Sequence, residues 1–552
     1  MDNYIDKMIN DKLENISNKK GNDIGYVARV QDYIVEIKNL DNVFYFERID
    51  ISDKAFGYVT NIKRNSVVVA LLKINKSIVP GDEAYATHKQ YKASVSPSLI
   101  GRIIDIFGYD KIVEKKFADL MEIDVETDVI PIMDRGKVQR PFLTGIAGID
   151  LIYPIGKGQR QLIIGDKKTG KTQLCLDAIV NQKDKNVKCI YIAIGKTKKE
   201  VKEIYSELLK RGAMQYTTIL SAFNDELPPV LSITPYVGLS IAENFLKDAC
   251  DVFVVIDDLK RHAEAYREFS LISGKTPGRD AYPADIFFTH SRLLEKGCQH
   301  INGGSITILP IVETKGGDIT DYISTNIISI TDGQIVMSTK DFLKGQKPAI
   351  NYGLSVSRLG GTVQEEEIKK IGSKTRMKLL NYLETKDVYE LANEDEMGPE
   401  HREKMKQGAL ILENLKQYKY SPVSLDDIIN KFKFIDIDLS INLDEDENDV
   451  IINSEAPDLV NAEDLKAISE NEEESIAEGD TTDNENAEEK NDEGDITDNV
   501  NVEDIINEVD NINNETEEIE SAKFNIINHI SSDDIEILKM DNFDDDEDKM
   551  RD

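Results

Sequence analysis

The sequence predicts an α/β protein with a small β-barrel first, a parallel α/β core in the middle and a helical domain after it. Three observations support this order. Short β-branched runs crowd residues 25–93, and apolar runs alternate with stretches of helical spacing over residues 94–363. Toward the C-terminal end the acidic residues gather, and too few apolar residues remain there to form a core.

The barrel is expected over residues 25–93. Residues 33–37 and 67–72 are runs of strand-forming residues, and Pro80-Gly81-Asp82 is a turn signal of the kind that separates such runs. Strands spaced this closely are typical of small barrels and sandwiches. Residues 1–24, before the barrel, are expected to form a helical segment.

The α/β core is expected over residues 94–363. Helices cover both faces of a parallel sheet, so its strands are continuously apolar. Such runs occur at residues 162–164, 189–194, 252–256 and 306–309. Residues 364–440 are rich in Glu, Lys, Leu and Met at helical spacing, which predicts a helical domain.

Charge is distributed unevenly along the chain. The whole chain has a net charge of −36, but residues 441–552 alone hold 41 acidic and 6 basic side chains. The body is therefore nearly neutral, which argues against a nucleic-acid binder, because such proteins show a basic face. The tail, residues 441–552, is predicted to be mostly disordered. Within it, residues 502–509 and 524–530 are candidates for folding on a partner.

Cysteine usage and hydropathy predict a cytosolic protein. No apolar run approaches the roughly 18 residues that span a bilayer, and the first twenty residues lack the apolar stretch of a secretory signal. A role at a membrane would therefore depend on partners. The cysteines show no metal-ligand spacing and are expected to be reduced and buried: Cys175, Cys189, Cys250 and Cys298.

The strongest motif is the phosphate-binding loop G-x-x-x-x-G-K-[ST]. It lies between an apolar run and a stretch of helical spacing, as this loop requires. Its backbone amides surround phosphate oxygens, its lysine neutralises phosphate charge, and its hydroxyl can bind Mg²⁺. The motif predicts a site for ATP or ADP with Mg²⁺ at Gly165, Asp166, Lys167, Lys168, Thr169, Gly170, Lys171 and Thr172.

A second motif ends the apolar run at residues 252–256 with Asp257 and Asp258. A strand that ends in Asp is common by itself. Beside a phosphate-binding loop, however, Asp257 is expected to hold the water shell of Mg²⁺ opposite Thr172.

The group that would activate water is missing from its usual position. In ring-shaped ATPases with this core, a Glu just beyond the next strand positions the attacking water. Here residues 189–194 are followed by Gly195-Lys196-Thr197-Lys198, with no carboxylate. Lys196 cannot accept a proton from water at neutral pH. The sequence therefore predicts a site that binds nucleotide without hydrolysing it.

Three long stretches resemble the alpha subunit of F-type ATP synthases: residues 141–172, 257–294 and 303–359. The likeness extends more weakly over residues 20–435 and implies that the core is a RecA-like domain. Alpha is favoured over beta because Lys196 stands where beta subunits carry a catalytic Glu and alpha subunits usually a Gln.

The resemblance also implies partners. It implies alternation with catalytic beta-type subunits in a 3+3 ring around a gamma-type central stalk, with a peripheral stalk and delta subunit. The ring would couple ATP synthesis or hydrolysis to proton transport at the cytoplasmic face of the cell membrane. The acidic tail has no counterpart in the family and is a candidate arm for a further partner.

Further site residues are implied by the resemblance alone. Arg358 matches an arginine that reaches the nucleotide of the neighbouring beta subunit, and Ser355 belongs to the same interface loop. Gln417 matches a residue near the adenine ring. Three lysines depart from residues usual in the family, which bears on nucleotide preference: Lys168, Lys196 and Lys419.

Three alternatives stay open. A related F-type-like motor driving a surface or motility machine is suggested by the tail and the lysines, and neighbouring genes for membrane-sector subunits would argue against it. A ring-shaped nucleic-acid translocase would need RNA-stimulated ATPase activity, and the chain lacks an aromatic and basic platform for it. A structural subunit without nucleotide conflicts with the intact phosphate-binding loop.

Overall fold

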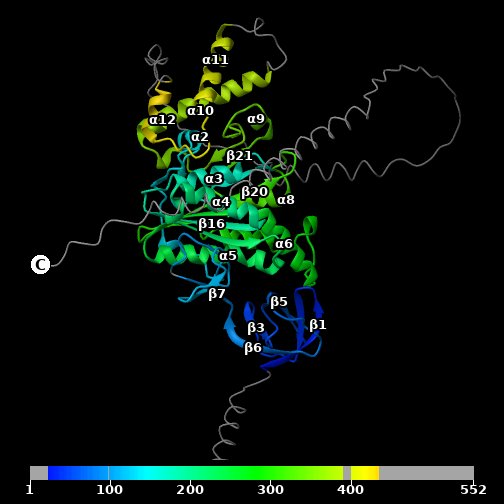
Figure 1. Ribbon diagram of the computed structural model, residues 1–552. Helices are drawn as coiled ribbons and strands as arrows, with labels where there is room; N and C mark the ends of the chain where they lie inside the picture. The colour runs from blue at the N-terminus through cyan, green and yellow to red at the C-terminus, as the bar shows by residue number, and fades with distance from the viewer. Residues whose placement is uncertain (1–22, 97, 389–398, 434, 436–552) are drawn as a thin grey trace, which may run out of the picture. The chain divides into compact units, whose positions relative to one another are not determined.

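The computed structural model describes residues 23–96, 98–388, 399–433 and 435 (Figure 1). The predicted tail and all but the last two residues of the predicted N-terminal segment lie outside the described residues. Within them the predicted order of barrel, α/β core and helices is confirmed. No described helix has the length and hydropathy needed to cross a bilayer.

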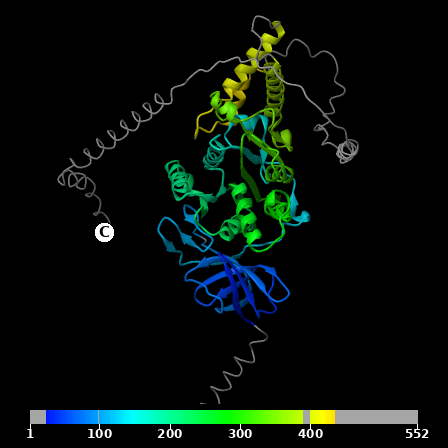
Figure 2. The ribbon, with the colours of Figure 1, turned by 90° about the vertical axis from the view of Figure 1, so that its right-hand side faces the viewer.

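Six antiparallel strands close the barrel in the order β1-β2-β5-β4-β3-β6 (blue in Figure 2). The predicted runs at residues 33–37 and 67–72 fall on β2 and β5. The strands are β1 (Ile24–Gln31), β2 (Ile34–Lys38), β3 (Glu47–Ile51), β4 (Ala55–Ile62), β5 (Val67–Ile74) and β6 (Glu83–Gln90).

The central sheet contains the order β17-β16-β18-β20-β15-β21, in which every neighbouring pair is parallel. All four predicted core strands are present in it. The strands are β15 (Leu162–Asp166), β16 (Val187–Lys196), β17 (Thr217–Phe223), β18 (Asp251–Asp257), β20 (Ser305–Thr314) and β21 (Gly333–Met337).

Helices cover both faces of this sheet. Figure 1 shows α3 (Lys171–Val180) and α4 (Lys198–Lys210) on one side of β16, and α5 (Pro228–Lys247) on the other. Successive strand residues point to opposite faces, so β16 contributes to two separate cores. Cys189, Tyr191 and Ala193 pack in the core of α3 and α4, whereas Ile190, Ile192 and Ile194 pack in the core of α5 and α6 (Leu259–Ile272).

The last part of the described chain is helical, as predicted. It consists of α10 (Glu366–Val388), α11 (Pro399–Asn414) and α12 (Leu425–Phe432). Side chains of these helices share one core with α2 (Ala147–Ile152), which lies just before the phosphate-binding loop in sequence. The segment that follows α11, residues 415–424, therefore lies near that loop.

Candidate functional site

The phosphate-binding loop connects the buried strand β15 to helix α3. Gly165 has φ +156°, and a Cβ there would lie 2.4 Å from the carbonyl oxygen of Met337. Gly170 has φ +100° and is the N-cap of α3. Both conformations favour glycine, and the helix N-terminus that they create directs unpaired backbone amides toward an anion.

Asp166 anchors the loop to the end of β20 and to residues that follow β20 and β21. Its carboxylate accepts hydrogen bonds from Thr314 Oγ1 (2.7 Å), Gly317 N (2.8 Å) and Thr339 Oγ1 (3.1 Å). Partial burial acts to raise the pKa of Asp166, but these hydrogen bonds outweigh it and leave the pKa below its ordinary value. The motif allows any residue here, so its pattern gave no sign of this anchoring role.

Lys171 and Thr172 begin α3 and face the loop. Lys171 is 7 % exposed, and its Nζ donates to the carbonyl oxygen of Asp166 at 2.5 Å. Burial lowers the pKa of Lys171. Thr172 Oγ1 donates to Asp257 Oδ2 at 2.8 Å. The structure thus brings together the two residues that the sequence predicts to hold Mg²⁺.

Asp257 lies at the end of β18 on the same face of the sheet as α3. Phe253 and Val255 pack in the core of α3, and the two-residue period of a strand places Asp257 with them. Its side chain is 2 % exposed. Tyr191 of the adjacent strand also donates to Asp257 Oδ2. Tyr191 carries no motif, and the sequence gave no sign of this contact.

Lys196 pairs with the other oxygen of the same carboxylate. Its Nζ lies 3.0 Å from Asp257 Oδ1, and the lysine side chain is 18 % exposed. Ile194 packs on the α5 face of the sheet, and strict alternation would put Lys196 on that same face, away from Asp257. The register with β17 shifts by one residue at Gly195, however, so Lys196 pairs with Phe223, which faces α3. This bulge brings the ammonium group to the phosphate-binding loop.

The ion pair with Asp257 compensates the positive charge of the largely buried Lys196. Burial alone would lower the pKa of Lys196, but the negative charge of Asp257 and its hydrogen bond outweigh burial and raise the pKa above its ordinary value. Asp258 is buried and caps α6 by accepting from Lys260 N at 2.7 Å. Burial and the neighbouring Asp257 raise the pKa of Asp258 to about 7.

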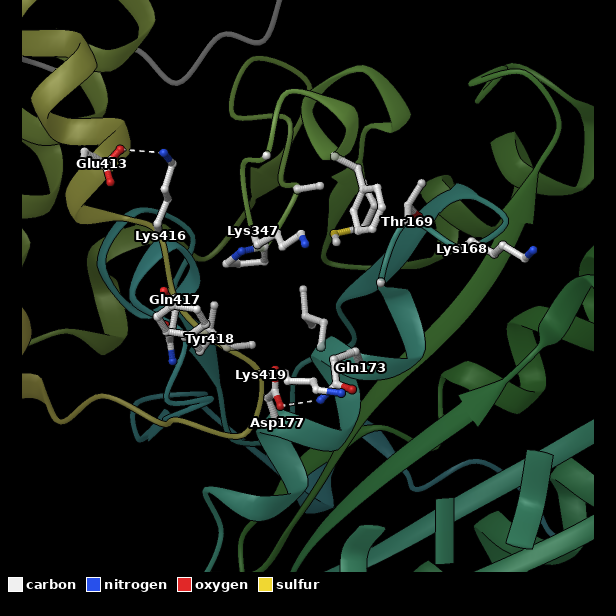
Figure 3. A pocket seen from close by; sticks show the side chains of 18 residues that line it. Lys168, Thr169, Gln173, Asp177, Lys347, Glu413, Lys416, Gln417, Tyr418 and Lys419 are labelled. Carbon is white, nitrogen blue, oxygen red and sulfur yellow. Dashed lines mark hydrogen bonds and ion pairs between the residues drawn. The ribbon is translucent and has the colours of Figure 1, made fainter. Parts of the chain in front are cut away.

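A cavity of about 830 Å³ opens beside the loop. Figure 3 shows Lys168 and Thr169 of the loop on one side and Gln417 and Tyr418 of the segment after α11 on another. The lining combines apolar side chains with many polar and charged ones, among them Lys168, Asp177 and Lys347. Its apolar members are Ile146, Leu174, Met337, Phe342, Pro348 and Ala349.

Gln417 lines this cavity, but its side chain is bound to backbone groups. Its Nε2 donates to the carbonyl oxygens of Gly145 (2.7 Å) and Ser421 (2.6 Å), and its Oε1 accepts from Ala147 N at 3.1 Å. The bonds to Gly145 and Ala147 hold the cavity wall to the start of α2. Lys419 also lines the cavity.

Ser355 and Arg358 do not line this cavity. They lie immediately before and after β22 (Val356–Ser357), a short strand that pairs with β21. Ser355 is buried: its Oγ accepts from Val336 N at 3.0 Å and donates to the carbonyl oxygen of Asn351 at 2.6 Å. Arg358 follows β22 and is exposed, with a 3.4 Å bond from Nη2 to the carbonyl oxygen of Ile328. No carboxylate in the described part of the chain pairs with Arg358.

Comparison with known proteins places this site in a family. Residues 145–357 match the nucleotide-binding domain of the ATP synthase alpha/beta family. The ATP synthase subunit alpha of Acetivibrio thermocellus is 40 % identical over 433 residues, 77 % of this chain and 84 % of the relative. That of Mycoplasmoides gallisepticum is 41 % identical over 429 residues, 76 % of this chain and 82 % of the relative.

Proposed function

This chain belongs to the ATP synthase alpha subunit family, and from this premise we propose that it is the non-catalytic, nucleotide-holding member of a rotary F-type ATPase ring. Family membership makes it part of an ATPase complex that binds nucleotide. The further step, that this chain holds nucleotide without turning it over, is our proposal.

One observation supports the proposal: β16 ends in a lysine, at the position where the resemblance leads us to expect a water-activating carboxylate in a catalytic subunit. Lys196 ends β16 and pairs with Asp257, and no carboxylate follows that strand until Glu200. Glu200 is committed to the start of α4, where it forms a capping box with Thr197. A protonated lysine cannot take a proton from water, so bound nucleotide would persist.

The loop and its neighbours suit a nucleoside triphosphate. Backbone amides at the start of α3 and the Lys171 ammonium would bind the phosphates, and the cavity lined by Gln417 would hold the base. The Thr172 hydroxyl and Asp257 carboxylate, 2.8 Å apart, would hold Mg²⁺ if it comes with the nucleotide. Bound Mg²⁺ would neutralise phosphate charge.

We also propose that Arg358 acts on the site of a neighbouring beta-type subunit. The residue is exposed, has no described carboxylate partner, and follows a loop that Ser355 ties to β21. A guanidinium held in this way can reach across an interface to phosphate charge. Arginines supplied in trans contribute about 10³-fold or more to turnover in related phosphoryl transfers.

The test is ATP hydrolysis by the purified ring carrying Arg358→Ala in this chain. We expect turnover to fall by about 10³-fold, while labelling of this chain by an azido-ATP photoprobe is unchanged. The matched control is Arg48→Ala, which removes another partly exposed arginine, one that pairs with Asp50 in the barrel. Undiminished turnover in Arg358→Ala contradicts the proposed role.

The proposed partners are beta-type subunits in a 3+3 ring, a gamma-type central stalk, and a peripheral stalk with a delta subunit, at the cytoplasmic face of the membrane. The acidic tail favours one additional partner with a basic surface. Such a partner would in turn favour the alternative that the ring drives a machine other than a proton channel. Purification of the tagged chain, with and without residues 441–552, tests both. Membrane-sector subunits recovered in both cases support the proton-coupled synthase.

A further inference from the structure

The Lys196–Asp257 ion pair alters the charge of the phosphate site. In proteins with this kind of phosphate-binding loop, the loop hydroxyl and an acidic residue on a neighbouring strand bind a divalent cation. Here both oxygens of Asp257 are already engaged: Thr172 and Tyr191 donate to Oδ2, and Lys196 lies 3.0 Å from Oδ1. A cation at Asp257 would have to share the carboxylate with a fixed positive charge.

The position of Lys196 makes this pairing part of the fold. The bulge at Gly195 turns the lysine to the α3 face, and its side chain is mostly buried. Like Lys171, it is close enough to Asp257 and Asp258 for their charges to act on it. The site thus holds one ammonium group from the start of α3 and one from the end of β16. The second neutralises the Asp257 charge, which would otherwise repel bound phosphates.

We propose that Lys196 makes nucleotide binding at this chain independent of Mg²⁺, because its ammonium group replaces the cation in neutralising Asp257. The inference rests on the proposed function, since it requires that nucleotide occupy the phosphate-binding loop. Lys196 is in this sense a specificity-determining residue: the site accepts free ATP and its magnesium complex alike. Nucleotide would then remain on this chain when free Mg²⁺ falls.

The test uses the intact ring with the full-length chain and an azido-ATP photoprobe. Photolabelling identifies which chain holds the nucleotide, so occupancy of the beta-type sites does not interfere. Half-saturation is measured for this chain in excess Mg²⁺ and in EDTA. The variants are Lys196→Gln, which removes the charge, Lys196→Arg, which keeps it, and Lys171→Ala, which disables the phosphate-binding loop.

For the wild type and Lys196→Arg we expect half-saturation to change by less than about threefold between Mg²⁺ and EDTA. In Lys196→Gln, EDTA should weaken binding by at least about tenfold, the effect of one charge interaction in a partly screened site. Wild-type labelling that EDTA abolishes, or equal Mg²⁺ dependence in the wild type and Lys196→Gln, overturns the inference. If labelling of this chain persists in Lys171→Ala or is absent throughout, the proposed function itself falls.

Discussion

Ser355→Ala tests whether the hydroxyl of Ser355 holds the loop before Arg358 to the sheet. Its Oγ accepts from Val336 N at 3.0 Å and donates to the carbonyl oxygen of Asn351 at 2.6 Å. Val336 is 5 % exposed and lies in β21. Alanine would leave the Val336 amide without its acceptor.

The magnitude follows from counting which groups lose a partner. The carbonyl oxygen of Asn351 stays satisfied, because the backbone amide of Ser355 also donates to it, at 3.2 Å. Only the Val336 amide is orphaned. A buried donor without a partner costs about 1–3 kcal/mol. A local loss of about 2 kcal/mol corresponds to roughly thirtyfold faster exchange of that amide proton.

The assay is hydrogen exchange with mass spectrometry on the full-length chain. Peptides covering Val336 should exchange roughly thirtyfold faster in Ser355→Ala. The matched control is Ser357→Ala, which removes a hydroxyl that only donates, to the carbonyl oxygen of Pro154 at 2.8 Å. The control should leave exchange at Val336 within about twofold of the wild type. Unchanged protection in Ser355→Ala would refute the anchoring role.

Two further predictions concern stability. Burial raises the pKa of Asp150 to about 6 from 3.8, so its ionisation destabilises the fold as pH rises, by about 2 kcal/mol between about pH 4.5 and about pH 7. The melting-temperature advantage of the wild type over Asp150→Asn should therefore shrink over this range, and a constant gap would contradict it. Lys296, 2 % exposed, pairs with Glu243 at 2.9 Å. Lys296→Met should cost about 3 kcal/mol by leaving that carboxylate unpaired, and Lys296→Met combined with Glu243→Leu should recover most of the lost melting temperature. A double variant no more stable than the single one would rule out this explanation.

Some of the site followed directly from the sequence because its chemistry is local. The phosphate-binding loop needs glycine at set spacing, a lysine and a hydroxyl, and these stand side by side in the chain. The flanking apolar runs predicted β15 and β18, which place Thr172 and Asp257 2.8 Å apart. The missing carboxylate after β16 was likewise visible, because it depends only on which residues follow a strand.

Other features were not accessible in this way, because they depend on register and packing between distant segments. Tyr191 is an ordinary strand residue until β16 pairs with β18 and brings its hydroxyl to Asp257. The resemblance placed Ser355 in an interface loop, and the structure adds that its side chain is buried against β21. Neither contact can be predicted from the spacing of residues along the sequence.

By itself the sequence determined the order of barrel, α/β core and helices, the nucleotide-binding loop, and a lysine at the end of β16. Hydrophobic period and motif chemistry are properties of neighbouring residues, so they can be read along the chain. Only the tertiary structure decided that Lys196 reaches Asp257. One extra residue at Gly195 reverses the face that alternation would give it, and such a shift exists only once β16 is paired with β17.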